Sequence, residues 1–102
     1  MAARFGDMLL EQRRRMGLSI QQVANTIKIR PQIIEFFENG NFASMPPRGY
    51  AQGMISSYAR FLGLNPREVV NAYFDDLMAY ERETSQQGGR FQDAAGYVNS
   101  RS

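Results

Sequence analysis

The stretch LSIQQV, residues 18–23, restricts the possible folds of this chain more than any other feature, because it contains a complete helix start. Ser19 is a good N-cap residue, and Gln22 stands three positions later. In such a capping box each side chain accepts a hydrogen bond from the backbone N–H of the other residue. Apolar residues on either side of the box can pack together as a hydrophobic staple. We therefore expect a helix that begins at Ile20 and ends near Thr26.

A second start signal follows only a few residues later. Pro31 suits the first position of a helix, since the N–H that proline lacks would be unpaired there anyway. Asn39 and Gly40 form a C-cap signal that ends this helix. The region 18–40 therefore predicts two short helices joined by a tight turn.

Three further helices are indicated by apolar residues at helical spacing and by glycine or proline at their ends. We place them at residues 4–16, 48–62 and 66–82. The buried side of the last one is expected to comprise Val69, Val70, Tyr73, Phe74, Leu77 and Met78. No stretch alternates as a strand would, so the sequence predicts an all-α fold with five helices.

The composition changes at Thr84 to Ser, Gln, Gly and Asn, which is typical of linkers. Apolar residues beyond this point are too sparse to build a core. We therefore divide the chain into a helical domain, residues 1–83, and a flexible linker or disordered C-terminal tail, residues 84–102.

The residue types exclude most catalytic and redox chemistry. There is no cysteine and no histidine among the 102 residues, which removes disulfides, zinc sites and Cys or His nucleophiles. Asp75 and Asp76 are adjacent on a helix, so they point apart rather than converging on one site. We therefore expect no enzyme activity, no metal and no cofactor.

The net charge of +2 is small but unevenly distributed. Residues 1–30 carry six basic and two acidic side chains, whereas residues 31–83 carry four basic and seven acidic ones. Both a solvated charged face and polyanion contact at one end of the domain fit this gradient. No apolar run approaches the ~18 residues that a membrane helix needs, so we expect either a soluble protein or a membrane segment outside this chain.

The stretch GLSIQQVANTIKIRPQIIEFFENG resembles the repressor/Cro-like (XRE-type) helix-turn-helix class over its full length, without a gap. Ala24 matches the small residue that lets the two helices cross closely. The core positions of the class are matched by Val23, Ile27, Ile34 and Phe37. The resemblance implies a five-helix repressor-like helix-turn-helix domain.

The segments IKIR, ENGNFASMPP and GYAQGMISSYARFLGLNP narrow the match, because they look like the cytoplasmic domain of the RodZ family. This resemblance covers residues 5–74, although Gln52, Met54 and Ser56 depart from the family pattern. It implies a membrane-anchored protein that binds the bacterial actin MreB and links cell shape to wall synthesis. On this basis we expect a cytoplasmic location, as the cytoplasmic part of a single-pass membrane protein whose membrane segment follows residue 102.

The helix over residues 48–62 has more apolar surface than one core-facing stripe requires. One stripe consists of Ala51, Ile55, Tyr58 and Leu62. A second stripe holds Tyr50, Met54 and Phe61, and it either packs on the next helix or faces a partner. We predict that a protein filament contacts Tyr50, Met54, Tyr58 and Phe61, of which Tyr58 better suits the core and Tyr50 the surface.

DNA binding is the alternative function, because a helix-turn-helix places the start of its second helix in the major groove. Arg30 can bond guanine and Gln32 adenine, but Pro31, Ile33 and Phe36 offer no such donors. The residues of this alternative site are Ser19, Lys28, Arg30, Gln32 and Arg48. The shortage of donors favours a protein partner over DNA. The RodZ resemblance implies that this partner is a bacterial actin filament, and no small-molecule substrate is expected.

Overall fold

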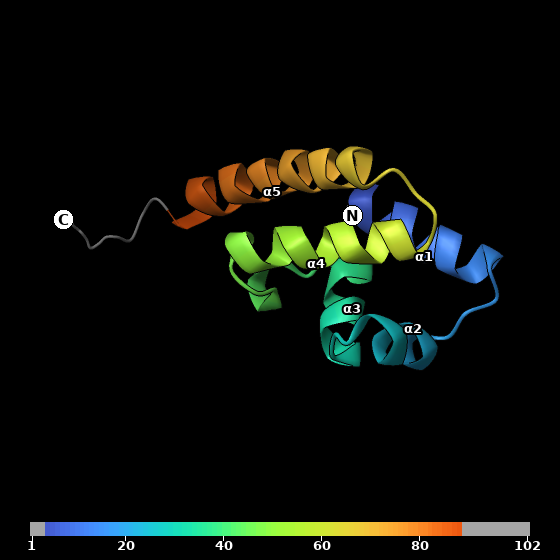
Figure 1. The fold of residues 1–102 in the computed structure, drawn as a ribbon. Coiled ribbons are helices and arrows are strands. Elements are labelled where there is room, and N and C mark those ends of the chain that lie inside the picture. The colour runs from blue at the N-terminus through green and yellow to red at the C-terminus, as the bar shows by residue number, and fades with distance from the viewer. Residues whose placement is uncertain (1–3, 89–102) are drawn as a thin grey trace.

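The structure is a computed structural model that describes residues 4–88 of the chain. This region contains five α-helices (Figure 1). They are α1 (Arg4–Arg15), α2 (Ile20–Ile27), α3 (Pro31–Asn39), α4 (Arg48–Phe61) and α5 (Pro66–Gly88). A short 3-10 turn, η1 (Phe42–Ser44), lies between α3 and α4. No strand occurs within residues 4–88, so the all-α prediction is confirmed.

The helices are arranged around α4 (Figure 1). Helix α5 runs antiparallel to α4 along one side, whereas α2 and α3 lie on the other side. Helix α1 packs against both α3 and α5, which closes the domain. The last turns of α5 extend past the start of α4.

Local signals set the ends of α2 and α3 as the sequence predicted. The Oγ of Ser19 accepts a hydrogen bond from the N–H of Gln22 at 3.0 Å, and the Gln22 Oε1 accepts one from the N–H of Ser19 at 2.8 Å. Helix α3 begins at Pro31 and ends before Gly40, which has a left-handed backbone with a φ of 67°. The capping box and the glycine C-cap are therefore confirmed.

Buried apolar side chains from all five helices and the α4–α5 turn form one core. The predicted helix-turn-helix positions lie in it, with Ile27 partly buried at its edge. Its members are Phe5, Leu9, Val23, Ala24, Ile34, Phe37, Ala51, Ile55, Tyr58, Ala59, Leu62, Val69, Ala72 and Tyr73.

Met78 is an exception to the predicted buried side of α5, because 55 % of its surface is exposed. Its neighbour Leu77 does pack against the core. Successive residues of a helix are about 100° apart, which turns residue 78 away from the core. The assignment of Met78 to the buried side was wrong.

Helix α5 is longer than predicted, since it continues through residues 84–88, which the sequence predicts to be linker. The ring of Tyr80 stacks on Phe42 of η1 with centroids 5.1 Å apart, which holds this end of the helix against the domain. The Thr84 hydroxyl donates to the carbonyl of Tyr80 at 3.0 Å. The rest of the expected tail, residues 89–102, lies outside the described residues.

Candidate binding surfaces

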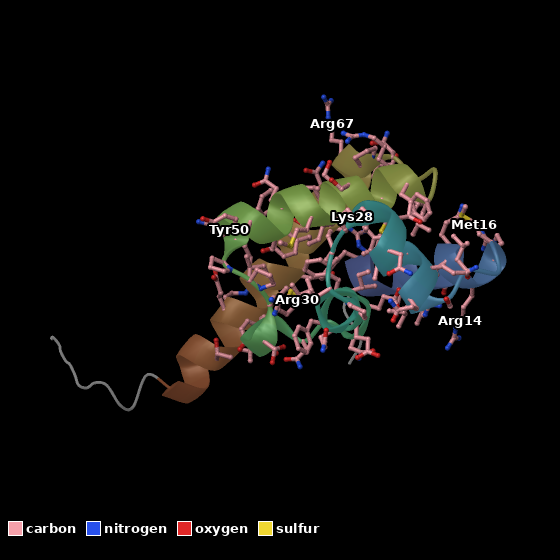
Figure 2. The ribbon with its side chains drawn as sticks, turned by 60° about the horizontal axis from the view of Figure 1, so that its bottom comes forward. Arg14, Met16, Lys28, Arg30, Tyr50 and Arg67 are labelled. Carbon is pink, nitrogen blue, oxygen red and sulfur yellow. The ribbon has the colours of Figure 1, made fainter. Side chains whose placement is uncertain are left out.

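The five residues of the DNA-binding alternative are all exposed. Lys28 ends α2 in a left-handed conformation with a φ of 61°, and Arg30 immediately precedes α3. Figure 2 turns the α2–α3 side toward the viewer and shows Lys28 and Arg30 there, with Arg14 at the far end of α1. The Ser19 hydroxyl accepts one hydrogen bond as a cap, and its proton remains available to a phosphate oxygen.

The outer face of α3 is poor in groups that read bases. Pro31 and Phe36 are half-buried, and Ile33 packs against the core. The exposed side chains include Gln32 and Glu35, and a carboxylate at this place repels phosphate. The first turn of α3 therefore offers one amide, Gln32, and a flanking guanidinium for readout.

Helix α4 presents a small apolar surface beside its core-facing side. Tyr50, in the first turn, is 70 % exposed, and Figure 2 shows it at the edge of the domain. Met54 and Phe61 are half-buried and pack partly on the core. We call Tyr50, Met54 and Phe61 the α4 surface.

Tyr58 does not belong to the α4 surface, because none of its surface is exposed. It shares its side of the helix with Ala51 and Ile55, which are also fully buried. A partner cannot contact Tyr58 in this fold, so its inclusion in the predicted contact set was wrong.

The comparison with protein families agrees with the geometry of α2 and α3. The family model described as "Helix-turn-helix domain" matches residues 8–69, which is more than half of the chain. The chain belongs to the helix-turn-helix domain family. Members of this family are typically non-enzymatic binding modules.

Two proteins similar to this helix-turn-helix domain add context. YmfM from Staphylococcus aureus, a candidate DNA-binding membrane protein, is 25 % identical with a TM-score of 0.65, and the match covers 71 % of this chain and 88 % of that one. An uncharacterised protein of Haemophilus influenzae is 37 % identical over 60 residues, which are 58 % of this chain. This match spans about 20 % of that curated relative's length.

A buried polar cluster that was not predicted from the sequence joins three helices of the helix-turn-helix domain. Glu38 of α3 is only 4 % exposed. The Arg13 guanidinium of α1 donates to both of its carboxylate oxygens, at 2.7 and 3.0 Å. The Tyr58 hydroxyl of α4 donates to the same carboxylate. Glu38 stands four residues after Ile34 on the core-facing side of α3, and this spacing was the available signal.

The cluster is structural rather than reactive. Burial raises the pKa of the Tyr58 hydroxyl above its usual value, and the hydrogen bond to Glu38 raises it further. The hydrogen bond to Glu38 also raises the pKa of Arg13. Arg13 donates once more, to the carbonyl of Leu18 at 2.9 Å. The cluster therefore connects α1 to the start of α2 and explains why Tyr58 is held inside.

No helix in the described part of this helix-turn-helix domain is both long enough and apolar enough to cross a bilayer. The same residues hold no group of three or more acidic, histidine or cysteine side chains able to bind a metal ion.

Proposed function

We propose that this helix-turn-helix domain is a non-catalytic adaptor that docks a bacterial actin filament of the MreB type through the α4 surface. The observation that carries the proposal is Tyr50, a large aromatic side chain left 70 % exposed on a helix that resembles the RodZ pattern. Aromatic and methionine side chains are enriched in the contact regions of protein interfaces. Met54 and Phe61 extend the same surface toward the core.

The proposal includes the place of the domain in a larger protein. The likeness to YmfM, a candidate membrane protein, supports a role as the cytoplasmic part of a single-pass membrane protein. Since α5 reaches Gly88, the proposed domain includes residues 84–88 as well as residues 1–83.

Co-sedimentation with polymerised bacterial actin tests the proposal. Tyr50→Glu places a charge on the α4 surface at an exposed position, so the fold should be preserved while the bound fraction falls at least tenfold. Met54→Glu should have the same effect, with circular dichroism confirming helicity. Gln52→Glu adds the same charge elsewhere on α4 and should bind like the wild type. Wild-type binding by Tyr50→Glu would refute the assignment.

DNA binding through α3 is a second candidate function. It is favoured by the exposure of Lys28, Arg30 and Gln32, and by the likeness to a candidate DNA-binding protein. Selection from a random-sequence duplex library at ~50 mM salt tests it, because phosphate contacts are strongest at low salt. A shifted complex that Arg30→Ala abolishes would support this function, and the absence of any shifted band would remove it.

A further inference from the structure

One side of α5 carries apolar residues that the domain covers only in part. Val70 and Phe74 are half-buried and pack partly on the core, and Met78 is 55 % exposed. They stand four residues apart, so they form one stripe along the helix. A partly exposed apolar stripe of this kind indicates an interaction surface.

A groove runs beside this stripe, between α4 and α5. Its volume is about 710 Å³, and Val70 and Phe74 form its apolar α5 side. On the α4 side, Gly49 and Gly53 line it, and a Cβ atom added at either glycine would meet nothing within 4 Å. Because the α4 backbone is bare there, a second helix can approach closely.

Charges of opposite sign flank the stripe at equal distances from its centre. Arg67 lies seven residues before Phe74, and Glu81 lies seven residues after it. Both side chains are exposed, and neither forms an ion pair within residues 4–88. At a rise of ~1.5 Å per residue, each charge lies ~10 Å from the centre.

This symmetry makes the α5 stripe complementary to itself. If two α5 helices pack antiparallel about a two-fold axis at Phe74, Arg67 of one copy lies opposite Glu81 of the other. In the same register Val70 lies opposite Met78, and the two Phe74 rings meet. A shift of the register by four residues in one direction would place Arg67 opposite Leu77. A shift by three residues in the other direction would place Val70 opposite Glu81. An isologous interface requires this kind of self-complementarity.

We propose that two copies of this chain form a symmetric dimer, with α5 of each copy lying in the α4–α5 groove of the other. The occupant of the groove is thus a second copy of α5, fixed in register by two Arg67–Glu81 pairs. The proposal does not depend on the proposed function. Tyr50 is not among the residues that line the groove, so we expect Tyr50 of both copies to stay accessible in the dimer.

Sedimentation equilibrium of the full 102-residue chain between ~5 and ~500 μM tests the dimer. The wild type should convert from monomer to dimer over this range. Arg67→Glu and Glu81→Arg each turn two attractive pairs into repulsive ones, so each should weaken dimerisation about tenfold or more. The double variant restores both pairs and should dimerise within about threefold of the wild type. Failure of the double variant to recover would overturn the register.

Two further variants separate dimerisation from folding and from filament docking. Gly53→Arg fills the groove, so the dimer should be lost. Because arginine is a better helix former than glycine, the melting temperature of the domain should not fall. Tyr50→Glu should dimerise like the wild type. A wild type that remains monomeric at ~500 μM would overturn the proposal and leave the groove to a helix of another protein. A Gly53→Arg variant that still dimerises would overturn it as well.

Discussion

Gly6 shows how closely one residue type can be required at a helix crossing. A Cβ atom at this position would lie 2.6 Å from the carbonyl oxygens of both Phe37 and Glu38. These are backbone atoms of α3, so they cannot move aside as a flexible side chain would. Glycine is therefore what allows α1 to pack directly on α3.

We expect Gly6→Ala to destabilise the domain by about 2 to 3 kcal/mol, although alanine is the better helix former. Gly53→Ala is the matched control, because its Cβ atom would meet open space. That variant should stabilise the domain by about 0.5 to 1 kcal/mol. Urea unfolding monitored by circular dichroism measures both, and equal destabilisation by the two variants would contradict the crossing argument.

Tyr58 makes the stability of the domain sensitive to alkaline pH. Its pKa is raised in the folded state by burial and by Glu38, and burial also raises the pKa of Tyr73. Below pH ~10 tyrosine is protonated in both states, so the contribution is fully present. Above pH ~10 the unfolded chain loses these protons and the folded chain retains them, so stability falls by up to about 1.4 kcal/mol per pH unit for each tyrosine.

The measurement is the free energy of unfolding in urea between pH 7 and pH 11. Tyr58→Phe should be less stable than the wild type at pH 7, because Glu38 loses a hydrogen-bond donor, but its stability should fall less steeply above pH ~10. Tyr50→Phe changes an exposed tyrosine and should follow the wild-type profile. An unchanged alkaline slope in Tyr58→Phe would show that this residue does not carry the effect.

The ends of α2 and α3 are set by local signals, whereas the last turns of α5 also make a contact with a residue distant in sequence. The capping box at Ser19 and the glycine at the end of α3 involve neighbours in sequence, so the sequence was sufficient to place them. The last turns of α5 contact Phe42 through Tyr80, which stands 38 residues after it. No local pattern reports such a contact, and the polar composition after Thr84 suggested an earlier end.

If Phe42 holds the end of α5, removing its partner should release the last turns of the helix. We expect Tyr80→Ala to lower the hydrogen-exchange protection of amides 82–88 by about 5- to 30-fold, equivalent to about 1 to 2 kcal/mol of lost local stability. Arg82→Ala changes an exposed side chain nearby and should leave protection unaltered. Protection that persists in Tyr80→Ala would mean that the helix ends independently of η1.

The sequence predicted which side of α4 each residue of the candidate docking site lies on, because helical spacing determines this. Spacing placed Tyr50 and Tyr58 on different stripes of α4 and favoured Tyr58 for the core and Tyr50 for the surface, which the structure confirms. It did not reveal the polar partners of Tyr58. The answer came from Glu38 and Arg13, which hold Tyr58 inside through a charge cluster built from three helices. Sequence position alone does not bring those helices together.

At the scale of the whole molecule, the first and last helices close the domain on each other. The rings of Phe5 and Tyr73 meet edge to face with centroids 5.3 Å apart. The N–H of Phe5 donates to the Oδ2 of Asp76 at 2.9 Å, so a side chain from α5 caps the start of α1. The adjacent Asp75 instead faces the side chain of Arg4 at 3.6 Å on the surface, so the two neighbouring carboxylates have different partners at the start of α1.

This difference between neighbours gives a prediction with a built-in control. Asp76→Ala should destabilise the domain by about 1 to 2 kcal/mol, because it leaves a helix N-terminus without its acceptor and its favourable negative charge. Asp75→Ala removes the same charge from an exposed pair, so its effect should stay within about 0.5 kcal/mol. Thermal and urea unfolding of the two variants at one pH compare them directly. Equal losses would mean that net charge, rather than the cap between α5 and α1, accounts for the effect, whereas a loss confined to Asp76→Ala would show that α5 stabilises the start of α1.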